Sequence, residues 1–165
     1  MNASLRVAVK YGLFVSSGLI AYFLMLKLFG LHENPWLRVF NGAIMGAGIF
    51  FAIKYYKLMT GTTFTYVDGF RTGLLTGFLA TAVFTLVMGV YVFHLDKEFA
   101  RTILRDWFDD TNQGAGILII ILILEGLAST AVLTLACMQI FKKSQNVGQQ
   151  ENLVERKKED DVSNT

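Results

Sequence analysis

Apolar residues along the chain gather in four long runs that are separated by short polar stretches. The runs cover about residues 7–29, 35–56, 69–93 and 116–141. Each run is longer than 20 residues, and a helix needs roughly 20 residues to cross a hydrocarbon core of about 30 Å. The pattern predicts an all-α, polytopic membrane protein in which residues 1–141 form one bundle of four transmembrane helices.

Two of the predicted helices carry start signals. Asn34 can cap the second run, and Pro35 suits the first helical position, where no backbone N–H donor is needed. Thr65 and Asp68 precede the third run with the spacing of a capping box, with Asp in place of the usual Glu. We therefore expect helices to begin at about Pro35 and just after Thr65.

Two polar segments lie outside the apolar runs. In residues 96–108 the apolar side chains share one helical face, formed by Phe99, Ile103, Leu104, Trp107 and Phe108. This pattern is typical of a short helix that lies on the membrane surface. Residues 142–165 are dense in Lys, Glu, Gln and Asn, which predicts a disordered cytoplasmic tail.

The distribution of Lys and Arg predicts which side of the membrane the termini face. Ten of the 15 cations belong to the N-terminus, the connection between the second and third runs, and the tail. The other five belong to the first and third connections, and the ratio falls to seven against five without Arg156, Lys157 and Lys158. Cytoplasmic loops carry an excess of Lys and Arg. Both termini are therefore predicted to lie in the cytoplasm.

Composition and motif content narrow the function classes. Hydrophobic residues make up 53% of the chain and charged residues 17%, and the mean hydropathy is +0.47. The net charge of +2 is too small to indicate nucleic-acid binding, and the single cysteine, Cys137, cannot form an intramolecular disulfide. The sequence has no nucleotide-binding loop, hydrolase motif or paired-cysteine metal motif. We expect no enzyme activity and no cofactor.

Small residues recur at every fourth position of the third run. The row consists of Gly69, Gly73, Gly77, Thr81, Thr85 and Gly89, and the second run offers a matching strip in Gly42 and Gly46. Residues four apart lie nearly above one another on a helix, so the row forms a groove that another backbone can approach. Two uses of this face remain open, namely packing inside one bundle and homodimerisation.

Glu125 is the only acidic residue inside a predicted run. An ionised carboxylate in hydrocarbon is costly, so we expect this group to be protonated, hydrogen-bonded or facing a wet cavity. Thr81, Thr85 and Tyr22 lie at comparable depth and are candidate partners, so Glu125, Thr81 and Thr85 form a candidate buried polar site. Glu125 either joins helices as a neutral carboxyl group or exchanges a proton for a cation in transport.

A metal site on the outer face is a further hypothesis. The potential ligands are His32, Glu33, His94, Asp96 and Glu98. Their spacing resembles no known metal motif, so the sequence predicts no metal centre.

The order of these features resembles a family of small four-helix inner-membrane proteins of Bacteroidota that is known as a domain of unknown function. The resemblance covers about residues 1–141. It rests on Asn-Gly-Ala-Ile-Met-Gly at residues 41–46 and on Tyr-Val-Asp-Gly-Phe at residues 66–70. It implies a location in the inner membrane of a Gram-negative bacterium and assigns no functional residues.

Taken together, these features predict a small integral membrane protein that acts as a non-enzymatic structural or accessory component. Its expected partner is the lipid bilayer, a homodimer remains one of the two alternatives, and no nucleic acid is expected. The alternative is a small oligomeric proton-coupled transporter or channel that uses Glu125. Because four helices rarely enclose a pathway alone, this alternative requires at least a dimer.

Overall fold

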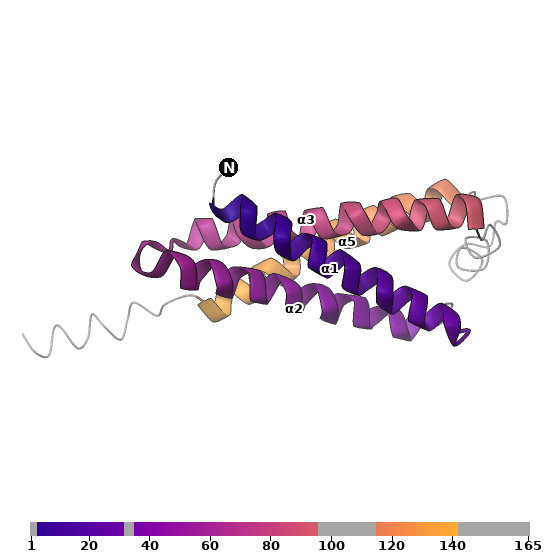
Figure 1. The fold of residues 1–165 in the computed structure, drawn as a ribbon, viewed down its shortest axis with the longest axis horizontal. Coiled ribbons are helices and arrows are strands. Elements are labelled where there is room, and N and C mark those ends of the chain that lie inside the picture. Colours follow the sequence, from indigo (N-terminus) through magenta and orange to yellow (C-terminus); the bar gives the residue numbers. More distant parts are fainter. Residues whose placement is uncertain (1–2, 32–34, 96–114, 142–165) are drawn as a thin grey trace, which may run out of the picture.

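The computed structural model describes residues 3–31, 35–95 and 115–141, which form four long helices (Figure 1). These are α1 (Ala3–Leu28), α2 (Pro35–Thr60), α3 (Tyr66–Val90) and α5 (Ala115–Phe141). A 3₁₀ turn, η1 (Gly61–Thr63), follows α2, and a π-helical turn, η2 (Tyr91–Leu95), continues α3. Within the described residues, the prediction of four helices that are long and apolar enough to span a membrane is confirmed.

The two predicted helix starts are also present. Helix α2 begins at Pro35, and Thr65 is the N-cap of α3, where its Oγ1 accepts a hydrogen bond from the Asp68 N–H at 3.2 Å. In a capping box the acid reaches back to the N-cap backbone N–H. The shorter Asp68 side chain instead accepts a 2.6 Å hydrogen bond from the Thr65 hydroxyl. The prediction is therefore right about the cap and wrong about the second bond.

Helices α2 and α3 each pack against the three other long helices, and α3 makes the more extensive contacts of the two. The start of α1, the turn between α2 and α3 and the end of α5 all lie at one end of the molecule (Figure 1). Successive helices therefore run in alternate directions. Helices α1 and α3 are parallel, whereas α3 and α5 are antiparallel.

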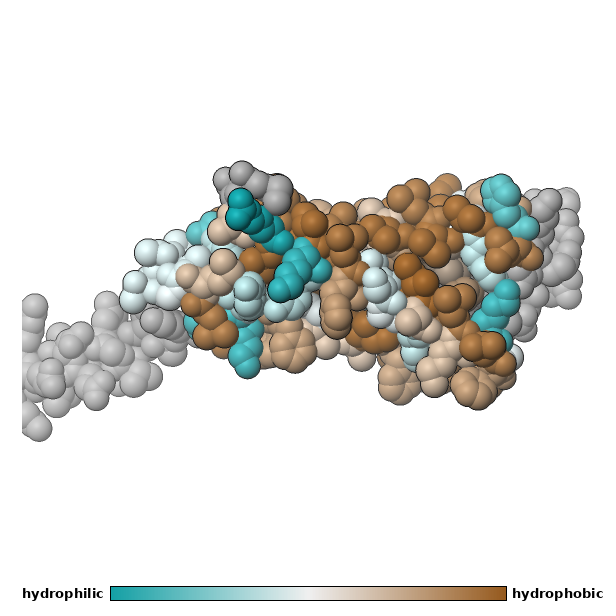
Figure 2. All heavy atoms as spheres, in the orientation of Figure 1, coloured by the Kyte–Doolittle hydropathy of each residue, from teal (hydrophilic) through white to brown (hydrophobic). Residues whose placement is uncertain are grey.

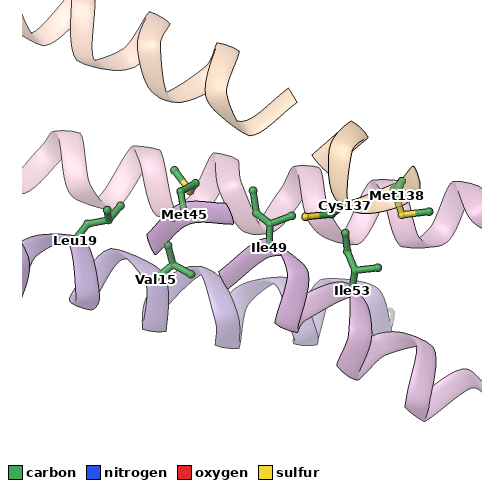
Figure 3. Close-up of a cluster of buried hydrophobic side chains, with 8 residues drawn as sticks. Val15, Leu19, Met45, Ile49, Ile53, Cys137 and Met138 are labelled. Carbon is green, nitrogen blue, oxygen red and sulfur yellow. The ribbon is translucent and has the colours of Figure 1, made fainter. Parts of the chain in front are cut away.

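The main apolar core joins three helices around α3. It contains Val15 and Leu19 of α1, Met45, Ile49 and Ile53 of α2, Ala80 of α3, and Cys137 and Met138 of α5 (Figure 3). Ile49, Ile53 and Met138 are fully buried. The buried side chains of α2 and α5 therefore meet beside α3 and form most of this core.

Large apolar side chains also cover the outside of the bundle. Phe14, Leu86 and Ile140 are 77%, 72% and 71% exposed. Figure 2 shows mainly apolar side chains across the middle of one face, with hydrophilic ones gathered toward its two ends. Water-soluble monomers rarely expose apolar patches of this extent, whereas a lipid-facing surface requires them.

The contact between α3 and α5 follows a regular antiparallel register. Four facing pairs make it up: Gly69 with Met138, Gly73 with Thr134, Gly77 with Thr130, and Thr81 with Gly126. Each pair lies four residues further along α3 and four residues earlier along α5. A Cβ placed on Gly77 would lie 2.5 Å from the Thr130 Oγ1. The two backbones therefore approach as closely as the absence of side chains on these glycines permits.

The strip of Gly42 and Gly46 on α2 does not pack against the row of small residues on α3. A Cβ on Gly46 would lie 3.3 Å from Leu133 of α5, and a Cβ on Gly42 would meet nothing within 4 Å. The Cys137 thiol points at the Gly46 carbonyl oxygen, with 3.9 Å between sulfur and oxygen. The row on α3 therefore serves packing inside the bundle from Gly69 to Thr81. Dimerisation through the same face would require α5 to move away.

Gly77→Ala should destabilise the protein by about 1–3 kcal/mol, because the added methyl group overpacks a contact that lacks space for it. Thermal unfolding in detergent measures this change. Gly42→Ala is the matched control: it lies inside a helix with open space at Cβ, and alanine favours helix by up to about 1 kcal/mol. It should be neutral or stabilising.

Combining Gly77→Ala with Thr130→Ala should recover part of the lost stability. The second substitution removes the Thr130 hydroxyl and methyl groups, while the Thr130 Cβ, 2.9 Å from the new methyl position, stays in place. If the two destabilisations simply added, the facing pair would not be in contact.

Candidate functional site

Polar side chains from three helices meet in one pocket of about 220 Å³. Its polar lining consists of Asn41 of α2, Thr81 of α3, and Glu125 and Ser129 of α5. The remaining lining residues are apolar or glycine: Leu19, Val39, Gly42, Met45, Phe84, Leu122 and Gly126. All four long helices thus contribute to a space that is apolar over most of its wall and polar at four positions.

Glu125 lies well inside α5. It follows Ala115 by ten residues, which places it about 15 Å along the helix axis. Glu125 and Val39 of α2 are exposed, whereas Thr81 of α3 is 5% exposed. The pocket therefore opens at the surface between α2 and α5 and reaches inward to α3.

Several buried oxygen atoms in the described residues have no hydrogen-bond partner. They are Asn41 Oδ1 and the hydroxyl oxygens of Thr81, Thr85, Thr130 and Thr134. By contrast, Thr72 and Thr76 donate 2.8 Å bonds to backbone carbonyls one turn earlier. An unpaired buried polar group costs about 1–3 kcal/mol. Two of the five, Asn41 and Thr81, line the pocket that contains Glu125.

The structure separates the residues that the sequence grouped around Glu125. Thr81 lines the pocket with Glu125. Thr85, one turn further along α3, does not line this pocket, but it lines an almost wholly apolar groove between α3 and α5, and Thr81 borders this groove as well. The Tyr22 hydroxyl donates a 3.0 Å hydrogen bond to the Leu37 carbonyl oxygen and so joins α1 to α2. Of the three candidate partners, only Thr81 shares the pocket.

Asn41 and Ser129 are pocket residues that the sequence reasoning missed. Ser129 follows Glu125 by four residues on the same helix, so the spacing alone places both on one face. Asn41 is an amide inside an apolar run, and that was a usable signal. Its position opposite Glu125 depends on how α2 is rotated, which the spacing does not reveal.

The other sequence hypotheses fall largely on residues that the structure leaves undescribed. His94 is exposed at the end of η2. His32, Glu33, Asp96 and Glu98 lie outside the described residues, so the metal hypothesis is untested. The predicted surface helix at residues 96–108 and the tail at residues 142–165 also lie outside them.

No protein-family model, curated protein or solved structure matches this chain.

Proposed function

We propose that this chain is an integral membrane protein that crosses the bacterial inner membrane four times and acts as a non-enzymatic structural or accessory component. The observation that carries the proposal is the combination of four membrane-length helices with an apolar exterior. Helix α5 supports it most directly. Only 11% of its apolar window is buried in the bundle, against 33% for each other helix, so its surface is available to lipid or a partner. The inner membrane as the location follows from the family resemblance.

The cations of the described helices support cytoplasmic termini. Arg6, Lys10, Lys54, Lys57 and Arg71 all belong to the end that holds the start of α1 and the end of α5. Because Lys and Arg are enriched on the cytoplasmic side, these five cations favour a cytoplasmic location for this end of the bundle.

Aromatic rings accompany the cations at both ends. The Lys57 Nζ lies 5.3 Å from the Phe141 ring centroid, and at the opposite end the Lys27 Nζ lies 4.3 Å from the Tyr91 centroid. Paired cations and aromatic rings suit the two headgroup regions, where long side chains can reach polar surroundings. The two pairs fit a single bilayer whose two headgroup regions lie at the two ends of the bundle.

The pocket favours a second candidate function, a small oligomeric proton-coupled transporter or channel. A carboxyl group about 15 Å along a membrane-spanning helix can carry either a proton or a charge. Asn41, Thr81 and Ser129 surround it with groups that can bind a solute. The outer face of α5 is the surface left for the second copy that such a pathway requires.

Labelling of single cysteines tests the crossing by α2 and the orientation of the bundle. In a Cys137→Ala background, Leu31→Cys and Thr62→Cys place thiols at exposed positions at opposite ends of the bundle. A small membrane-impermeant maleimide that reaches the periplasm should label Leu31→Cys in intact cells and Thr62→Cys only after lysis. The reverse pattern would place the termini outside, and equal labelling of both would contradict a crossing by α2.

Glu125→Gln tests proton coupling. Proteoliposomes with a pH-sensitive dye inside are given a gradient of Na⁺, K⁺ or an organic ammonium ion. The transporter candidate predicts proton movement that Glu125→Gln reduces by about tenfold or more, since the amide cannot exchange a proton. Asp68→Asn is the matched control, because Asp68 lies at the start of α3 and outside the pocket. If proton movement is the same with Glu125→Gln as with the unsubstituted protein, the carboxyl group only joins helices.

A further inference from the structure

We propose that the half of α3 that ends at η2 binds one anionic phospholipid, with an acyl chain on each side of the helix and the phosphate at Lys27 and His94. The proposal rests on the membrane placement described above, because it requires a headgroup region at this end of the bundle. It does not require Glu125, which lines neither of the two grooves described next.

Two apolar grooves follow this half of α3, one on each side of a ridge. The α1/α3 groove has a volume of about 380 Å³, and the α3/α5 groove, which Thr85 also lines, has a volume of about 650 Å³. Leu86 and Val90 line both grooves and are 72% and 60% exposed. Because they lie four positions apart on one helix, they form a single ridge between the grooves. This shape suits a ligand with two apolar chains.

The length of each groove suits an acyl chain. Along α3, the α1/α3 groove extends from Leu86 to Leu95, which is about 14 Å, and the α3/α5 groove extends from Phe78 to His94, which is about 24 Å. One leaflet takes up about half of a hydrocarbon core of about 30 Å. An acyl chain that begins at the headgroup region can therefore follow either groove through most of its leaflet.

A basic side chain lies at the headgroup end of each groove. The Lys27 Nζ lies 4.3 Å from the ring centroid of Tyr91, which lines the α1/α3 groove. His94 lines the α3/α5 groove and follows Val90 by four residues, so it lies about one turn beyond the ridge. A phospholipid carries its phosphate on the glycerol unit that joins the two chains. At this level Lys27 offers a positive charge and His94 an N–H donor to the phosphate.

The charges of the described residues favour a lipid over a second copy of the chain. Neither groove is lined by Asp or Glu, and α1, which carries Lys27, contains neither residue. The two acids among the described residues are Asp68, at the opposite end of α3, and Glu125 in the polar pocket. A two-fold dimer through this surface would bring the basic groups of both copies together at one level. An anionic headgroup instead complements them.

Native mass spectrometry of the full chain in detergent tests the class of lipid. Phosphatidylglycerol and phosphatidylcholine with the same two acyl chains are the probes, and only the first has a net negative charge. Phosphatidylglycerol should bind at least about fivefold more tightly, because its charge complements Lys27. Lysophosphatidylglycerol, which has one chain, should bind at least about threefold more weakly than phosphatidylglycerol. Equal affinity in either comparison would overturn the proposal.

Two lysine variants locate the headgroup. Lys27→Met and Lys10→Met each remove one charge whose Nζ lies over a tyrosine ring, at 4.3 Å from Tyr91 and 5.4 Å from Tyr55. Lys27→Met should reduce the preference for phosphatidylglycerol over phosphatidylcholine about threefold or more, and Lys10→Met should leave it unchanged. Equal effects of the two variants would contradict the assigned position of the phosphate.

Gly89→Leu tests the α3/α5 groove by filling it. A Cβ on Gly89 would have Ile119 as its nearest neighbour at 3.8 Å, so a side chain can enter the groove without moving the backbone. Gly42→Leu is the matched control, because a Cβ there meets nothing within 4 Å and Gly42 lines neither groove. Gly89→Leu should weaken phosphatidylglycerol binding about threefold or more, and Gly42→Leu should not change it.

Thermal unfolding checks that both glycine variants fold, and the lysine pair still decides if they do not. If Gly89→Leu removes dimers and leaves lipid affinity unchanged, a second copy covers the surface and the proposal is wrong. Loss of lipid selectivity together with the predicted cysteine labelling would reject the lipid site and retain the membrane placement. Reversed labelling with the selectivity intact would retain the site and move it to the cytoplasmic leaflet.

Discussion

The close antiparallel contact between α3 and α5 is the constraint on which the rest of the bundle depends. In lipid, apolar side chains gain little by leaving the acyl chains for a neighbouring helix, so association depends on dense packing and short-range contact. Gly73 and Gly77 provide this, because Thr134 and Thr130 occupy the space that their side chains would fill. Since α3 also packs against α1 and α2, its position sets that of every other described helix.

The same contact positions the polar pocket. Thr81 and Gly126 form the last pair in the register from Gly69 toward the far end of α3. Successive residues on a helix are about 100° apart, so when Gly126 faces α3, its neighbour Glu125 is turned to the side of that contact. There it shares the pocket with Asn41 and with Gly42, whose missing side chain leaves the space open. The pocket thus results from the packing of α5 against α3 and from Gly42, whose Cβ position no other atom occupies.

The parts of this structure that could be predicted are those that depend on local chemistry. Run length indicates a membrane-spanning helix, Pro35 fixes a helix start, and Thr65 caps α3 through an atom three residues away. For the row of small residues on α3, the sequence could predict only two alternative roles, packing inside the bundle or homodimerisation. Such a row shows that another backbone can approach closely, but it does not show which helix that backbone belongs to. Thr81 and Thr85 are equivalent in the sequence pattern, whereas in the structure Thr81 borders both the pocket and the apolar groove and Thr85 borders only the groove.

The unpaired oxygens divide into two groups with different physical causes. The Thr130 hydroxyl and methyl groups both lie against the backbone of Gly77, where the hydroxyl oxygen faces a Cα–H group that acts as a weak donor. Close packing therefore compensates part of the cost of that unpaired hydroxyl. Asn41 Oδ1 is closed to solvent although Asn41 lines the pocket beside Gly42, so water in the pocket does not offset its unpaired state.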